Sequence, residues 1–196
     1  MAPNTQQTKL HYPTFKESMV DAKQELLDAI NACEQTRGMR GVYEACTEVM
    51  EDKYRIFESR LPLDFPERRW HVLIMGGMVA STKGDYQAAT ELDTLSMQFA
   101  GSDEQRAISL LNLSEDHRYA GRYSESLRNA KEAYALCPNH IGIAANLAIS
   151  HAKTGNRETA QQIIRLFIAS MDESDPNDMF AALATYDDEV QDLIPT

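Results

Sequence analysis

A local pattern recurs at a fixed interval of 34 residues in the second half of the chain. Four residue types repeat in register: Asn112, Leu113, His117 and Gly121 return as Asn146, Leu147, His151 and Gly155. A third copy of the glycine turn begins at Gly84, 37 residues before Gly121. A period of this length is typical of stacked helical repeats, in which two helices are joined by a tight turn. The pattern therefore predicts an all-α fold.

Apolar residues spaced three or four apart place a helix on each side of every glycine turn. We expect helices at 70–83 and 86–99, at 105–120 and 123–136, and at 141–154 and 157–171. Two longer helices are expected upstream, from about Thr14 to Thr36 and from about Gly41 to Leu61. The predicted organisation is a mobile tail (1–12), an N-terminal helical hairpin (13–66), three repeats spanning 70–172 (70–103, 107–140 and 141–172) and an acidic C-terminal cap (173–196).

The charge and the cysteines narrow the class of partner and the compartment. A net charge of −11 and a pI near 4.9 disfavour nucleic acid, because phosphate binding needs clustered Lys and Arg. Three widely spaced cysteines predict a reducing compartment rather than a disulfide framework. The polar N-terminus lacks the apolar core of a signal peptide, and the apolar run Val72 to Ala80 is too short for a membrane span. We therefore expect a cytoplasmic protein with no membrane contact.

Residues that could carry chemistry are scattered. His117 and His151 occupy equivalent repeat positions, but one helical pair of about 20 Å keeps them too far apart to share a metal ion. The acidic run from Asp172 lacks the glycine and glutamate that a calcium loop needs. No nucleophile or phosphate-loop motif is present. The prediction is a protein that is not an enzyme and that uses no metal and no cofactor.

The repeat resembles the tetratricopeptide repeat over residues 70 to 172. Small residues fall where that family packs its helices closely, with Gly77, Ser114 and Ala148 in one row and Ala89, Ser126 and Ala160 in another. The turn from Gly84 to Ala89 is the nearest to the family pattern. One departure is Asp93, which stands where an apolar residue is expected. The resemblance implies a short right-handed helical-repeat solenoid, preceded by the N-terminal hairpin and closed by a C-terminal capping helix.

The resemblance also implies a concave groove lined by the first helix of each repeat. Carried over, its lining residues are Ile74, Met75, Met78, Leu111, Asn112, Glu115, Tyr119, Asn146, Ile149 and Lys153. The two asparagines recur at a position where the family often bonds the backbone of an extended peptide. A side-chain amide suits that role because it offers both a donor and an acceptor. The aliphatic and methionine residues would accept apolar side chains.

We therefore expect a non-catalytic adaptor or chaperone-like module that binds an extended, partly apolar segment of another protein in this groove. The basic residues with which the family clamps a C-terminal carboxylate are missing, since Ile74 and Asn146 stand at two of their positions. The alternative is a structural protein that forms a homodimer through the N-terminal hairpin, with the groove occluded by the chain itself. An enzyme within a helical fold and an RNA reader are the remaining hypotheses.

Overall fold

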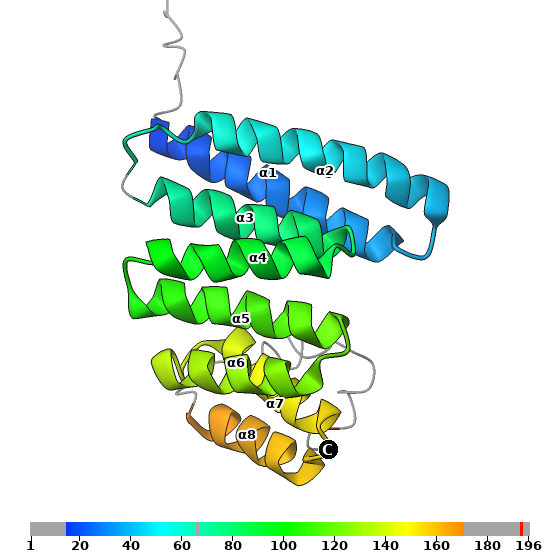
Figure 1. Cartoon of the computed structure of the whole chain (residues 1–196), viewed down its shortest axis with the longest axis vertical. Helices are drawn as coiled ribbons and strands as arrows, with labels where there is room; N and C mark the ends of the chain where they lie inside the picture. Colours follow the sequence, from blue (N-terminus) through cyan, green and yellow to red (C-terminus); the bar gives the residue numbers. More distant parts are fainter. Residues whose placement is uncertain (1–14, 66, 171–192, 194–196) are drawn as a thin grey trace, which may run out of the picture. The chain divides into compact units, whose positions relative to one another are not determined.

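The computed structural model describes residues 15–65, residues 67–170 and Leu193, with side chains from Met19 onward except those of 168 and 170. Within these residues the secondary structure is helical, without a β-strand (Figure 1). This confirms the all-α prediction. The chain divides into two compact units, one holding the first two helices and the other holding the rest. The predicted tail lies outside the described residues, as does the cap apart from Leu193.

The first unit is a helical hairpin of α1 (Phe15–Thr36) and α2 (Arg40–Arg60). Helix α1 buries Ala22, Leu26, Ile30 and Cys33, whose spacing of three or four residues places them on one face. Helix α2 buries Met50 and Phe57 against it. Across the hairpin, Lys53 Nζ donates to Glu25 Oε2 at 2.6 Å, and this contact lowers the pKa of Glu25. The chain leaves α2 at Leu61, immediately before Pro62, which cannot continue a helix.

The second unit contains three successive helix pairs, which follow one another in order in Figure 1. The first pair is α3 (Arg68–Thr82) and α4 (Tyr86–Ser96), and a short 3-10 helix, η1 (Met97–Phe99), extends α4. The second pair is α5 (Asp103–Tyr119) and α6 (Tyr123–Leu136). The third is α7 (Ile141–Lys153) and α8 (Arg157–Ser170). All six helices coincide with the predicted ones to within a few residues.

The three turns inside these pairs are built alike. Gly84, Gly121 and Gly155 have φ angles of 81°, 75° and 81°. This left-handed conformation is open to glycine without the penalty that a Cβ atom incurs. In each turn the glycine N–H bonds the carbonyl three residues earlier, at 2.9–3.0 Å. The next N–H bonds the carbonyl five residues before it, at 2.7–3.0 Å. These bonds satisfy carbonyls that the end of the first helix would otherwise leave without partners.

Side-chain caps fix where the following helices begin. Asp85 accepts a hydrogen bond from the Ala88 N–H at 3.1 Å and starts α4. Ser102 accepts from the Gln105 N–H at 3.1 Å and starts α5. Gln105 in turn accepts from the Gly101 N–H at 2.6 Å, close to a capping-box arrangement. Side-chain hydrogen bonds close to each start thus fix where α4 and α5 begin.

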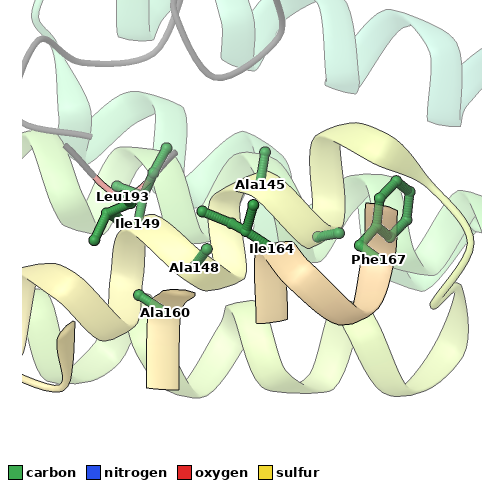
Figure 2. Packing of buried hydrophobic residues seen from close by; sticks show 8 residues of the cluster. Ala145, Ala148, Ile149, Ala160, Ile164, Phe167 and Leu193 are labelled. Atoms are coloured by element: carbon green, nitrogen blue, oxygen red, sulfur yellow. The ribbon is translucent and has the colours of Figure 1, made fainter. Parts of the chain in front are cut away.

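The core of the second unit runs between the pairs. One cluster joins α5, α6 and the start of α7 through Ala107, Leu110, Leu111, Ala133 and Ile143. A second cluster joins α7 and α8 and includes Leu193 (Figure 2): Ala144, Ala145, Ala148, Ile149, Ala160, Ile164, Phe167 and Leu193. Helix α5 contacts both α3 and α7 in addition to its chain neighbours. The first helices of the three pairs therefore form one continuous layer.

None of the described helices combines the length and the apolar character that crossing a membrane requires.

Candidate functional site

The ten predicted groove residues all lie on the layer formed by α3, α5 and α7. They are distributed as Ile74, Met75 and Met78 on α3, Leu111, Asn112, Glu115 and Tyr119 on α5, and Asn146, Ile149 and Lys153 on α7. Because α5 contacts both of the other helices, the structure brings the three sets onto adjacent elements. This is the arrangement that a binding surface spanning the pairs requires.

Their exposure is uneven. Five are buried, namely Ile74, Met75, Leu111, Asn146 and Ile149. Four are half-buried, namely Met78, Asn112, Glu115 and Lys153. Tyr119 is exposed. Only the last five residues therefore offer side-chain surface to a ligand in this conformation, whereas the buried five contribute to the core.

The covering of α7 explains much of this burial. Every residue from Gly142 to Ser150 is buried, so the helix is enclosed on all its faces. Helices α5, α6 and α8 pack against it, and Leu193 belongs to the same cluster as Ile149. Figure 2 shows the Leu193 and Ile149 side chains beside each other. Two of the three predicted groove residues on α7, Asn146 and Ile149, are therefore buried within the chain itself.

Tyr119 is the centre of the accessible part of the site. Its ring stacks on Tyr86 of α4, with ring centroids 5.8 Å apart and planes at 18°. The Arg118 guanidinium lies 4.5 Å from the Tyr119 ring centroid, a cation–π distance. Arg118 is itself buried, and its Nε and Nη2 atoms make no hydrogen bond within the described part of the chain. Two aromatic rings and a cation thus form an ordered group at the end of α5.

The two asparagines have different surroundings. Asn146 is 1% exposed, and its Nδ2 donates to Ser114 Oγ at 2.8 Å. Its amide is therefore engaged inside the protein rather than presented to a peptide. Asn112 is half-buried, and its Nδ2 makes no hydrogen bond of normal geometry among the described residues. Its amide nevertheless lies close enough to Asp93 to favour the charged form of that carboxyl.

Ser114, the acceptor of the Asn146 amide, belongs to a buried cluster of hydroxyl groups. Ser114 Oγ donates to the Ser126 carbonyl at 2.9 Å and lies 3.1 Å from Ser126 Oγ. Ser150 Oγ is 3.0 Å from Ser126 Oγ and 3.4 Å from Ser114 Oγ. Each hydroxyl can donate one bond and accept others, so neutral groups satisfy one another here. The cluster holds α5, α6 and α7 together without any charge.

A second polar group, which the sequence reasoning missed, lies between α4 and α5. Asp93 and Asp116 are 1% and 2% exposed. Burial raises the pKa of Asp93 well above its usual value, and the Asp116 charge raises it further. Burial also raises the pKa of Asp116 to about 6, although the nearby Ser81 hydroxyl and Asp93 carboxyl group oppose that shift. The sequence signal was Asp93 at an apolar position, but nothing local identified Asp116 as its partner.

Burial also shifts the pKa values of three further candidates, His117, His151 and Cys33. Burial lowers the pKa of His117 and of His151, and the positive charges of Arg122 and Lys131 respectively lower it further. Burial raises the pKa of the Cys33 thiol to about 11, which keeps it in the unreactive thiol form. Among the described residues, no three His, Cys, Asp or Glu side chains gather closely enough to hold a metal ion.

Comparison with known proteins identifies no relative: no protein-family model matches the sequence, and neither does any curated protein.

Proposed function

We propose that this chain is a non-catalytic protein-interaction module, adaptor or chaperone-like, that binds an extended and partly apolar peptide segment. In this proposal α3 to α8 are three tetratricopeptide-like repeats of a short right-handed solenoid. The observation that carries the proposal is the continuous layer of α3, α5 and α7 behind three turns of the same geometry. Helix pairs that are joined by turns of the same geometry have similar shapes. When such pairs stack, their first helices lie on the same side of the stack.

The half-buried and exposed members of the predicted groove define the chemistry of the ligand. Met78 offers an adaptable apolar surface, Asn112 an amide and Tyr119 an aromatic face. An extended peptide matches this set because its backbone units alternate with side chains. In this proposal the peptide contacts Met78, Asn112, Glu115, Tyr119 and Lys153. The five buried residues pack beneath them in the core.

The test is selection from a displayed library of short peptides, followed by affinity measurement on variants of the full chain. Tyr119→Ala and Asn112→Ala should each weaken the selected peptides at least several-fold. Tyr123→Ala is the matched control, because Tyr123 is also a tyrosine with 41% exposure but lies at the start of α6. Peptides whose binding is unaffected by the first two changes would rule out this groove.

A specific observation favours the second candidate function, which is homodimerisation through the N-terminal hairpin. Val42, Val49 and Ile56 of α2 are 49%, 52% and 37% exposed. Their spacing of seven residues places them on one stripe of the helix. An apolar stripe of this kind suits a second helix, and the second copy of α2 would supply one.

Light scattering separates the two candidates. If the hairpin dimerises, the wild-type chain has twice the monomer mass, and Val49→Glu reduces it to the monomer. Val20→Glu is the control, since Val20 is 54% exposed but lies on α1, away from the stripe. A monomeric wild-type chain that still binds selected peptides would exclude dimerisation as the purpose of the fold.

A further inference from the structure

The buried carboxyl pair, Asp93 and Asp116, joins three helices at one point. Asp93 comes from α4 and Asp116 from α5, and each is almost fully enclosed. Gly77 of α3 lies directly over Asp93: a Cβ atom at that position would be 2.6 Å from Asp93 Oδ1 and 2.9 Å from its Cγ. The carboxyl group therefore fits only because α3 has a glycine there. The Asp93 carboxyl thus fills the space that the missing side chain of Gly77 leaves.

Two ionised carboxylates cannot both be stable in such a site. Adjacent negative charges repel, and burial removes the water that would screen them. Apart from the nearby Asn112 amide, neither Asp93 oxygen meets a donor group among the described residues. A proton on Asp93 removes this conflict, because the neutral carboxyl can donate to Asp116.

The other polar and charged groups near the pair favour a charge on Asp116 and oppose one on Asp93. Glu115 of α5 adds a further negative charge near Asp93. Arg122, just before α6, favours the charged form of Asp116, and its Nη2 also donates to Thr90 Oγ1 of α4 at 3.3 Å. On α3, the nearby Ser81 hydroxyl also favours the charged form of Asp116. Asp116 thus has partners for its charge, whereas Asp93 has a second carboxylate and a glutamate beside it.

We propose that the carboxyl pair is a proton-dependent contact: protons bound by the pair hold α4 on α5, and their loss loosens the α3–α4 hairpin from the rest of the second unit. The contact makes the junction sensitive to pH in the weakly acidic to neutral range. The proposal does not require peptide binding, although Asn112 lies near Asp93 and is also one of the predicted groove residues.

The sign of the effect follows from proton linkage. Both aspartates have folded-state pKa values above the unfolded value, so the folded chain holds protons that the unfolded chain releases. The pair therefore contributes its full stability below about pH 4 and loses it as pH rises through the folded-state values. For each proton held only by the folded chain, the unfolding constant rises about tenfold per pH unit between the two values.

The experiment is urea unfolding of the full chain at a series of pH values from 5 to 8. The wild-type unfolding constant should rise more steeply with pH than that of the variant combining Asp93→Asn with Asp116→Asn, in which His117 and His151, whose pKa values burial lowers, favour the folded state as pH rises. Asp103→Asn is the matched control, an exposed aspartate on α5 whose replacement should leave the rise unchanged. Equal pH slopes in the wild type and the double variant would overturn the proposal.

A second measurement needs no variant. Carbon NMR of the wild-type carboxyl groups should show two aspartates that remain protonated above pH 5, one of them titrating at about 6. Amide hydrogen exchange, corrected for its intrinsic pH dependence, should show faster opening of α4 at pH 8 than at pH 5. If both carboxyl groups are ionised at pH 5, or if α4 opens equally at the two pH values, the proposal fails.

Discussion

Two junctions of the second unit, α4 with α5 and α6 with α7, have different residue types at equivalent repeat positions. The first contains two carboxyl groups, and the second contains neutral hydroxyl groups. In the first, the three positions are Gly77, Asp93 and Asp116, all buried. In the second, at spacings of 37, 37 and 34 residues, they are Ser114, Ala130 and Ser150, also buried.

Neighbouring helix pairs thus pack against each other in two different ways at equivalent positions. The hydroxyl cluster is neutral and internally hydrogen-bonded, so its stability does not depend on a titrating group. The carboxyl pair needs both a proton and the space that Gly77 leaves. The stability of the carboxyl junction therefore changes with pH, because proton binding contributes to its free energy.

The largest expected effect comes from placing the acid in the wrong junction. Ala130→Asp puts a carboxyl at the position equivalent to Asp93, but faces it with Ser114 instead of a glycine. Ala130 is fully buried, so the new group has neither space nor a carboxyl partner. We expect a loss of about 3–5 kcal/mol in unfolding free energy, as for an uncompensated buried charge. Calorimetry at pH 7 measures it, and a loss below about 1 kcal/mol would show that the two junctions are not equivalent.

The second prediction fills the space over the carboxyl pair. In an ordinary helix, Gly→Ala stabilises by about 1 kcal/mol. At Gly77 the sign should reverse, with a loss of about 1–3 kcal/mol, because the new methyl group would overlap the Asp93 carboxyl. Asp93→Ala should make the Gly77→Ala change tolerable again, because it removes the carboxyl group that the new methyl group would overlap. Chemical denaturation of the four chains in this double-mutant cycle gives the coupling, and additive effects would refute the direct contact.

The third prediction compares the asparagines of the two repeats. Asn146→Ala removes the donor to Ser114 inside the hydroxyl cluster, which should cost about 1–2 kcal/mol of unfolding free energy. Asn112→Ala, at a half-buried position, should cost less than about 1 kcal/mol. Thermal unfolding of both variants provides the measurement. If Asn112→Ala is the more damaging change, then its amide supports the carboxyl pair more than it serves a ligand.

The helices and turns could be predicted because they depend on local residues. Gly84, Gly121 and Gly155 stand where the backbone needs a positive φ, and the apolar spacing on each side sets the helix faces. The burial of the site could not be predicted in the same way. Asn146 and Ile149 look like groove residues by position, yet Ser114 and Leu193, both distant in the sequence, enclose them.

The carboxyl pair marks a similar limit. Asp93 is conspicuous in the sequence as an acid among apolar positions, but its partner depends on how α4 meets α5. Asp116 shares its repeat position with Ser150, and both residue types are common on exposed helix faces. Only the packing shows that one of these positions holds a second acid beside Asp93 and that the other belongs to a hydroxyl cluster.

The last prediction, also of a small effect, tests the neutral junction. Ser126→Ala removes one hydroxyl from the cluster and leaves alanine at a position where the other two repeats already have Ala89 and Ala160. We expect a loss of only about 0.5–1.5 kcal/mol, because Ser114 and Ser150 still lie 3.4 Å apart and can bond each other. The loss should be the same at pH 5 and pH 8, since no member of the cluster titrates in this range. A loss that grows with pH would mean that the hydroxyl cluster is coupled to the carboxyl pair through α5, and that the two junctions respond to protons as one.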